Sequence, residues 1–359
     1  MSDMSTGVAP SSFAIAGRKI GAGHPPYVIA ELSGNHNGDI ARAFALMDAA
    51  KAAGADAVKL QTYTADTITI DHDGPGFVIE GGLWAGRKLH ELYREAHTPW
   101  EWHPALFDHA RKLQIHCFSS PFDPTAVDLL ESLGAPAYKI ASFEIIDLPL
   151  IARAARTGKP LIISTGMANP DEIAEAVAAA TDAGATAIAL LHCVSGYPTP
   201  AAEANLARIA VLKARFPFPI GLSDHTLGHE VAIAAVALGA DLVEKHFTLA
   251  RADGGPDSAF SLEPAELKAL CEGVRIAHSA IGRGEYGRAS SEAGNVVFRR
   301  SLYVVADVLK GEAFTAANLR SIRPGHGLPP KHLPGLLGQR AARDIARGTP
   351  MQFDLAAKP

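Results

Sequence analysis

The sequence has little cysteine, no strongly basic stretch and no long apolar run, and each of these absences excludes a class of protein. Cys117, Cys193 and Cys271 are the three cysteines of a 359-residue chain, too few and too scattered for a disulfide framework or a zinc knuckle. We expect them to be buried thiols in a reducing cytoplasm. With a formal net charge of -5, the chain is not expected to bind nucleic acid or a membrane surface.

Export and membrane insertion are not expected either. No apolar run reaches the roughly 18 residues that a membrane helix requires. The first residues, MSDMSTGVAPSSF, lack the basic start and apolar core of an export signal. We predict a flexible N-terminus over residues 1–12 and a cytoplasmic location.

Short apolar or β-branched runs alternate with Ala- and Leu-rich stretches of helical spacing, which is typical of repeated βα units. The strand candidates are residues 27–32, 57–62, 116–120, 137–142, 161–165, 187–192, 219–224 and 242–247. Eight strands close a (β/α)8 TIM barrel, which needs about 250 residues. We therefore predict an α/β protein with a TIM-barrel domain over 13–282, a linker over 283–298 and a small second domain over 299–359.

Most of the strand candidates begin apolar and end polar, so their polar residues should meet at the C-terminal mouth of the barrel, where barrel enzymes carry their chemistry. Because side chains alternate along a strand, residues two apart point the same way. The pairs expected to point inward are Lys59 with Gln61, Ser142 with Glu144, Ser223 with His225, and Glu244 with His246.

His225 and His246 end neighbouring strands, so their imidazoles are candidates for sharing one divalent ion with an open coordination position. A single histidine at a strand end is more often a hydrogen-bonded structural residue. Two such histidines, with Asp224 and Glu244 available as supporting groups, favour the metal interpretation.

Two lysines and several serines are expected at the mouth, a set suited to a phosphate and a carboxylate. They are Lys59, Lys139, Ser142, Ser164, Ser195 and Ser223. In the alternative interpretation, each lysine forms a salt bridge with Glu31 or Glu144 and each serine caps a helix. Helix capping is the expected role of Asn169 and Asp147.

Glu31 and Glu144 are candidate proton-transfer groups, because a carboxyl group in a closed barrel mouth can have its pKa raised toward neutrality. The sequence does not decide which of them donates and which accepts a proton. The glycine-containing loops 33–38 and 253–258 allow the backbone to approach a ligand closely.

These motifs, taken together, resemble the sialic acid synthase family in order and spacing. The segments are AELSGNHNG, DAVKLQTYT, CFSSPFD, AYKIASFE, ISTGM, HCVSGYPTP, GLSDHT, EKHFT and GGPDSAFS. RRSLYVV, KGEAFTAANL and SIRPGHGLPP look like the family's C-terminal antifreeze-like (SAF) domain. Within the family, AELSGNHNG and GGLWAGRKLHELYREAHTPWEWH look most like the pseudaminic acid branch.

The resemblance implies a metal-dependent condensation of phosphoenolpyruvate with 2,4-diacetamido-2,4,6-trideoxy-altrose, which gives a nine-carbon 2-keto acid and phosphate. It implies that His225 and His246 hold Mn²⁺, or else Mg²⁺ or Co²⁺, and that Glu31 and Glu144 take part in catalysis. The implied phosphoenolpyruvate contacts are Lys59, Gln61, Lys139, Ser142, Ser164, Ser195 and Ser223. The implied sugar contacts are Tyr197, Asp257 and Arg323, with Arg323 entering the partner's site in a domain-swapped homodimer.

Other functions remain open from the sequence. N-acetylneuraminate and legionaminate synthases share this chemistry and differ in the groups at sugar carbons 4 to 6. A metal-dependent aldolase or hydrolase on the same barrel would use the two histidines without requiring phosphoenolpyruvate. A non-enzymatic scaffold with an ice- or carbohydrate-binding tail is the least favoured alternative, because it gives the lysines, glutamates and histidines of the mouth no function.

Overall fold

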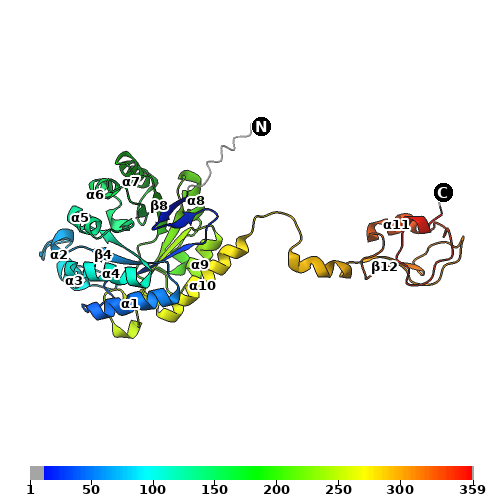
Figure 1. Cartoon of the computed structure of the whole chain (residues 1–359), viewed down its shortest axis with the longest axis horizontal. Helices are drawn as coiled ribbons and strands as arrows, with labels where there is room; N and C mark the ends of the chain where they lie inside the picture. The colour runs from blue at the N-terminus through cyan, green and yellow to red at the C-terminus, as the bar shows by residue number, and fades with distance from the viewer. Residues whose placement is uncertain (1–11, 358–359) are drawn as a thin grey trace. The chain divides into compact units, whose positions relative to one another are not determined.

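The computed structural model describes residues 12–357 and divides into two units, which meet in the chain at Gly282 and Arg283 (Figure 1). Residues 1–11 of the predicted flexible N-terminus lie outside the described residues, and Ser12 already belongs to the first strand. Among the described residues, no helix is both long and apolar enough to cross a membrane.

Eight parallel strands form a closed barrel in the first unit, as predicted. In order around the barrel they are β3 (Tyr27–Glu31), β4 (Ala57–Thr62), β5 (His116–Pro121), β6 (Tyr138–Ile140), β7 (Leu161–Ser164), β8 (Ile188–Cys193), β9 (Ile220–Asp224) and β10 (Leu242–His246), with β10 pairing back onto β3. A hairpin of β1 (Ser12–Ile15) and β2 (Arg18–Gly21) precedes them.

Helices follow the strands and surround the barrel (Figure 1). They are α1 (Ile40–Ala53), α2 (Ala65–Ile68), α3 (Leu89–Ala96), α4 (His103–Leu113), α5 (Pro124–Ser132), α6 (Leu148–Ala155), α7 (Pro170–Asp182), α8 (Arg208–Arg215), α9 (Glu230–Ala237) and α10 (Pro264–Ile281). Short 3₁₀ turns are η1 (Trp100–Trp102), η2 (Ser142–Glu144), η3 (Ala201–Glu203), η4 (Arg251–Asp253) and η5 (Ser258–Phe260). Asp147 and Asn169 cap α6 and α7, as expected.

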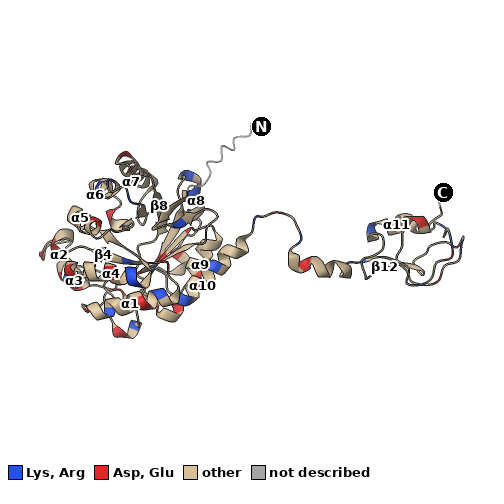
Figure 2. Cartoon of the chain, viewed as in Figure 1, with Lys and Arg blue, Asp and Glu red and all other residues tan. Residues whose placement is uncertain are grey.

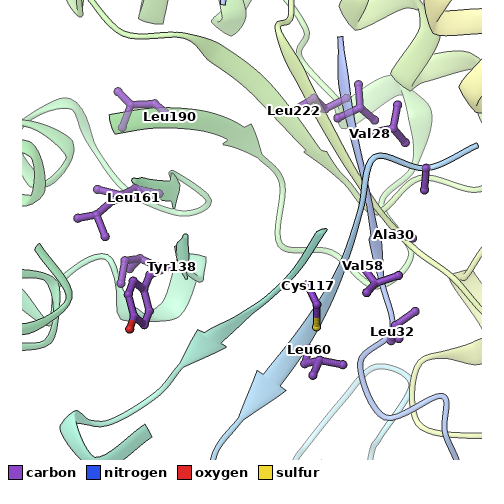
Figure 3. Packing of buried hydrophobic residues seen from close by; sticks show 14 of the residues in the cluster. Val28, Ala30, Leu32, Val58, Leu60, Cys117, Tyr138, Leu161, Leu190 and Leu222 are labelled. Atoms are coloured by element: carbon purple, nitrogen blue, oxygen red, sulfur yellow. The ribbon is translucent and has the colours of Figure 1, made fainter. Parts of the chain in front are cut away.

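Side chains alternate along the barrel strands and divide the apolar residues into two cores. Outward-facing side chains such as Val28 and Val58 pack in a cluster with the helices (Figure 3). Inward-facing side chains such as Ile29 and Phe118 form a second cluster, which Ile15 of the β1–β2 hairpin joins. The inner core is therefore apolar in the N-terminal part of the strands and leaves their C-terminal ends for polar residues.

The second unit is small and has a core of its own. It contains η6 (Ser290–Phe298), β11 (Ser301–Val304), β12 (Leu319–Ile322), η7 (Pro330–His332), α11 (Leu333–Leu336) and η8 (Phe353–Leu355). Strands β11 and β12 pair antiparallel, and Leu302, Phe314 and Met351 are fully buried around them. The 3₁₀ turn η6 lies within the stretch predicted as a linker.

Candidate active site

The inward-facing row of side chains becomes polar at the C-terminal ends of the barrel strands. Buried residues at this level include Glu31, Lys59, Lys139, Ser164, Ser223, Glu244 and His246. Acidic and basic residues are interspersed over the surrounding helices (Figure 2). The two buried lysines therefore form a local positive site rather than part of a basic surface.

Glu244 lies between the two lysines. Its Oε1 is 3.0 Å from Lys59 Nζ and 3.3 Å from Lys139 Nζ, and it accepts a hydrogen bond from Ser223 Oγ at 3.2 Å. Burial alone would raise the pKa of the Glu244 carboxyl group, but Lys139 and Lys59 lower it to about 2. Glu244 is therefore an ionised counter-ion, and its Oε2 is buried with no hydrogen-bond partner among the described residues.

Lys59 has a second carboxylate partner, Glu31, whose Oε2 lies 3.0 Å from Lys59 Nζ. Glu31 Oε1 accepts hydrogen bonds from Gln61 Nε2 at 3.0 Å and from Ser33 N at 3.1 Å. Burial raises the pKa of Glu31 to about 7, although Lys59 opposes this shift. Salt bridging of Lys59 to Glu31 thus occurs, whereas Lys139 pairs with Glu244 instead of Glu31 or Glu144.

Ser142 and Glu144 lie at the mouth but not on a strand, because β6 ends at Ile140 and the chain turns into η2. The expectation that they form an inward pair on one strand is therefore wrong. Ser142 Oγ accepts a hydrogen bond from Gly166 N at 3.1 Å. A Cβ on Gly166 would lie only 2.6 Å from Ser142 Oγ and 2.5 Å from Ser195 Oγ, so a side chain at this position would displace the two serines.

Glu144 carries an unused buried oxygen. Its Oε2 has no hydrogen-bond partner among the described residues. Burial raises the pKa of Glu144 to about 7, with Lys139 acting in the opposite direction. Ser164 Oγ, at the end of β7, is likewise buried without a partner. These free polar atoms indicate places where a ligand can bind.

The two histidines predicted as metal ligands lie together, with ring centroids 5.3 Å apart. His225 Nδ1 is 3.0 Å from the carbonyl oxygen of Val194 and must carry the hydrogen of that bond, which leaves Nε2 free. His246 Nδ1 is buried without a hydrogen-bond partner, 3.9 Å from Asp257 Oδ2. Burial, together with His225, holds the pKa of His246 well below its usual value.

The lowered pKa of His246 fits a divalent ion, because the neutral imidazole is the form in which histidine binds metals. Burial lowers the pKa of His225, but Cys193 and the Val194 carbonyl raise it above its usual value, so any proton on its free nitrogen must leave when the ion binds. The described residues contain no group of three His, Cys, Asp or Glu side chains placed to hold an ion. Oxygen atoms of water or substrate would have to supply the other coordination positions.

A second buried ion pair lies on the outer side of the same strand ends. Lys245 Nζ is 2.6 Å from Asp224 Oδ2 and donates to the carbonyl oxygen of Thr226 at 2.5 Å. Since Asp224 and Thr226 flank His225 in the chain, and Lys245 precedes His246, this pair connects the two segments that carry the histidines. The sequence had suggested only a supporting role for Asp224 and did not identify Lys245.

Cys193 was not identified as a site residue from the sequence, although it lies at the mouth. Its Sγ is 3.8 Å from His225 Nδ1 and 4.0 Å from Ser195 Oγ. All three cysteines are buried free thiols, as predicted. The signal for Cys193 was available, because it lies two residues after inward-facing Leu191.

The predicted sugar contacts fall in both units. The Tyr197 ring lies 4.5 Å from that of His225, and partly buried Asp257 accepts a short hydrogen bond from Ser33 Oγ. Arg323 belongs to the second unit, where it lines a hollow of about 580 Å³ together with Asn295, Phe298, Arg299, Arg300 and Pro330. The structure thus brings the predicted barrel residues together, and within the second unit Arg323 lines a hollow with two further arginines.

A closed parallel barrel with buried lysines, carboxyl groups and two histidines at its C-terminal mouth defines a barrel enzyme for an anionic substrate. The sequence comparison makes the assignment more specific. Residues 46–286 match the NeuB family and residues 299–355 match the SAF domain. The chain belongs to the NeuB family, as its resemblance to sialic acid synthases predicted.

Known relatives agree with this assignment. The chain is 44% identical over 331 residues to a pseudaminic acid synthase of Helicobacter pylori, which covers 92% of this chain and 97% of that protein. It is 39% identical over 321 residues to an N,N'-diacetyllegionaminic acid synthase of Campylobacter jejuni, covering 88% and 96%. The crystal structure of an N-acetylneuraminic acid synthetase from Leptospira borgpetersenii matches with a TM-score of 0.72 and 33% identity, covering 80% of this chain and 95% of that one.

Replacing Glu244 by Gln should destabilise the barrel unit, because two buried ammonium groups would lose their shared counter-ion. We expect the free energy of unfolding to fall by about 3–5 kcal/mol, measured by urea denaturation. The control is Glu272→Gln on α10, which breaks an exposed pair with Lys268 and should change the free energy by less than about 1 kcal/mol. Equal effects of the two substitutions would contradict the role assigned to Glu244.

Proposed function

We propose that the chain is a pseudaminic acid synthase, which joins phosphoenolpyruvate to open-chain 2,4-diacetamido-2,4,6-trideoxy-altrose. The products are a nine-carbon 2-keto acid and phosphate. The observation that carries the proposal is the buried Lys59–Glu244–Lys139 cluster beside two histidines, in a chain whose similarity to pseudaminic acid synthases extends over most of its length. We propose that the protein is located in the cytoplasm.

The charge balance of the pocket favours a phosphorylated carboxylic acid. Lys59 and Lys139 contribute two positive charges, and Glu244 contributes one negative charge. Because the pKa of Glu31 is about 7, Glu31 is partly protonated near neutrality and compensates the remaining charge incompletely. We propose that the anionic groups of phosphoenolpyruvate bind here, with Gln61 and the serines Ser142, Ser164, Ser195 and Ser223 as further donors.

His225 and His246 would hold the metal ion, and Mn²⁺ or Mg²⁺ suits a site completed by oxygen ligands. When bound, the ion would supply Lewis-acid polarisation of the sugar aldehyde. Carbon 3 of phosphoenolpyruvate then forms a bond to the aldehyde carbon, whose oxygen becomes a hydroxyl group. Water adds to carbon 2, and one of its protons passes through the base to the former aldehyde oxygen. The bond from carbon 2 to the phosphate oxygen then breaks, and the second water proton leaves with the phosphate as the keto group forms. Lys59 and Lys139 stabilise the departing phosphate.

We assign the proton of the attacking water to Glu144 rather than to Glu31. Both carboxyl groups have a pKa of about 7, but their oxygens differ in availability. Oε1 of Glu31 accepts hydrogen bonds from Gln61 Nε2 and Ser33 N, and its Oε2 lies 3.0 Å from Lys59 Nζ. Neither Glu31 Oε2 nor Glu144 Oε2 has a hydrogen-bond partner among the described residues, but only Glu31 Oε2 is held in an ion pair. A general base needs an oxygen within reach of the proton that it removes.

Arg323 is proposed to act in the site of a second copy of the chain, in a domain-swapped homodimer. Its hollow also presents Arg299 and Arg300, a concentration of guanidinium groups suited to an anionic or carbonyl-rich ligand. We expect Arg323→Ala chiefly to weaken sugar binding.

The substrate assignment is tested by incubating the protein with phosphoenolpyruvate and Mn²⁺, offering the diacetamido-trideoxy-altrose and N-acetylmannosamine separately. Phosphate release and product mass are measured. We expect release with the altrose sugar, loss of release in EDTA with recovery on adding Mn²⁺, and no turnover by His225→Ala.

The outcomes separate the candidate functions. Release only with N-acetylmannosamine would move the protein to the N-acetylneuraminate synthases. Turnover of a sugar without phosphoenolpyruvate would support an aldolase. Full activity of His225→Ala in EDTA would remove the metal from the proposal while leaving the substrates in place.

The pH dependence of kcat tests the role of Glu144. A base must be ionised, so the rate should fall as the pH drops below about 7, the pKa of Glu144. Glu144→Gln should lower kcat by about 10²–10⁴-fold and remove this acidic limb. The exposed Glu175 on α7 provides the control, since Glu175→Gln should leave the profile unchanged. An acidic limb that persists in Glu144→Gln would assign it to another group.

Co-expression of Arg323→Ala and His225→Ala tests whether Arg323 acts across a dimer, when activity is measured at a sugar concentration too low for either variant alone to turn over. In a mixed dimer of Arg323→Ala and His225→Ala, one site would combine intact His225 with Arg323 from the other chain. Random pairing makes half of the dimers mixed, with one complete site each, so about a quarter of the wild-type activity should return. If Arg323 acts within its own chain, no mixed dimer has a complete site and no activity returns.

A further inference from the structure

A hairpin between α2 and α3 carries Trp84 at the barrel mouth. Backbone hydrogen bonds join its arms, from Ile79 N to Arg87 O at 2.9 Å and from Leu89 N to Phe77 O at 2.9 Å. These bonds hold the turn in a defined conformation. Trp84 therefore occupies a prepared position rather than a random one in an unstructured loop.

Trp84 connects loops that follow three different barrel strands. The hairpin follows β4, and Trp84 Nε1 donates a hydrogen bond at 2.8 Å to the carbonyl oxygen of Pro256, in the loop after β10. The Trp84 ring also lies 5.5 Å from that of Tyr197, in the loop after β8. Trp84 remains partly exposed, so part of the indole is available for contact with a ligand.

Trp84, Tyr197 and Phe260 together form what we call the aromatic wall. The Tyr197 ring is 5.4 Å from that of Phe260 and 4.5 Å from that of His225. The Phe260 ring is 4.9 Å from that of His246. The wall therefore adjoins the two histidines at which the sugar aldehyde is proposed to react, on the loop side of the charged pocket.

The chemistry of the wall favours a sugar with apolar substituents. The proposed substrate has a methyl group at carbon 6 and two acetamido methyl groups. These methyl groups form no hydrogen bonds with water, and their burial against aromatic rings is favourable. N-acetylmannosamine has hydroxyl groups at carbons 4 and 6, which would lose hydrogen bonds to water against the same surface.

We infer that Trp84 is a specificity-determining residue, which contacts the apolar substituents of the sugar and selects a deoxy, doubly acetamido sugar over a more hydroxylated one. This inference rests on the proposed function. If Trp84 only held the hairpin in place, its removal would disturb the whole mouth and weaken the binding of both the sugar and phosphoenolpyruvate. A role in sugar selection changes sugar binding and leaves phosphoenolpyruvate binding, which the strand-borne lysines govern, unchanged.

The test is steady-state kinetics of the full chain with Mn²⁺, in which the sugar and phosphoenolpyruvate are varied in turn. Wild type, Trp84→Ala, Trp84→Phe and Leu83→Ala are compared. Leu83 is the neighbouring residue in the same turn and is 47% exposed, so Leu83→Ala controls for a change in the hairpin itself. The melting temperature of each variant is recorded.

Trp84→Ala should raise the KM for the diacetamido sugar by at least about tenfold and leave the KM for phosphoenolpyruvate within about twofold. Trp84→Phe should lie between wild type and Trp84→Ala, because it keeps an aromatic face, and Leu83→Ala should match wild type. An unchanged sugar KM, or a parallel rise in both KM values, would overturn the inference. A wild-type protein that releases no phosphate with either sugar would overturn the proposed function first, and the inference with it.

Discussion

The charge balance around Glu244 is the constraint on which the barrel mouth depends. A carboxylate on β10 is placed between ammonium groups on β4 and β6, and all three are almost completely removed from water. Such groups are tolerated only when each charge has a close partner. A shift of one residue in any of these strands would turn its charged side chain toward the helices. The positive pocket therefore requires the register of strands on different sides of the barrel to be kept.

Much of the fold was predictable because it depends on local periodicity. The alternation of strand and helix patterns located all eight barrel strands, and the two-residue repeat placed Lys59 and His246 on the inner face. The repeat failed at Ser142 and Glu144, because it holds only within a strand and β6 ends at Ile140. Where the backbone turns into a 3₁₀ helix, side-chain direction no longer follows from parity.

Which residues pair with one another in the site was harder to predict than which residues belong to it. Lys59 and Glu244 are 185 residues apart in sequence, and a pattern of apolar and polar residues contains no information on which charges pair across a barrel. Lys139 was expected to pair with Glu31 or Glu144 and pairs with Glu244 instead. Cys193 was missed because a cysteine in an apolar run predicts a buried structural thiol, and only its two-residue spacing from inward-facing Leu191 indicates that the thiol faces the mouth.

At the barrel mouth, the strands carry the charged residues and the loops carry the aromatic residues. Strand side chains are held by the backbone hydrogen bonds of a closed sheet, so a charge pattern built on them is hard to alter without loss of stability. Loop side chains such as Trp84 and Tyr197 are fixed by a few contacts that can change without disturbing the barrel. The binding site for the anion, which all substrates of such a family share, is then expected on the strands. Discrimination among related sugars belongs on the loops, where one aromatic side chain can change the apolar surface that a substrate meets.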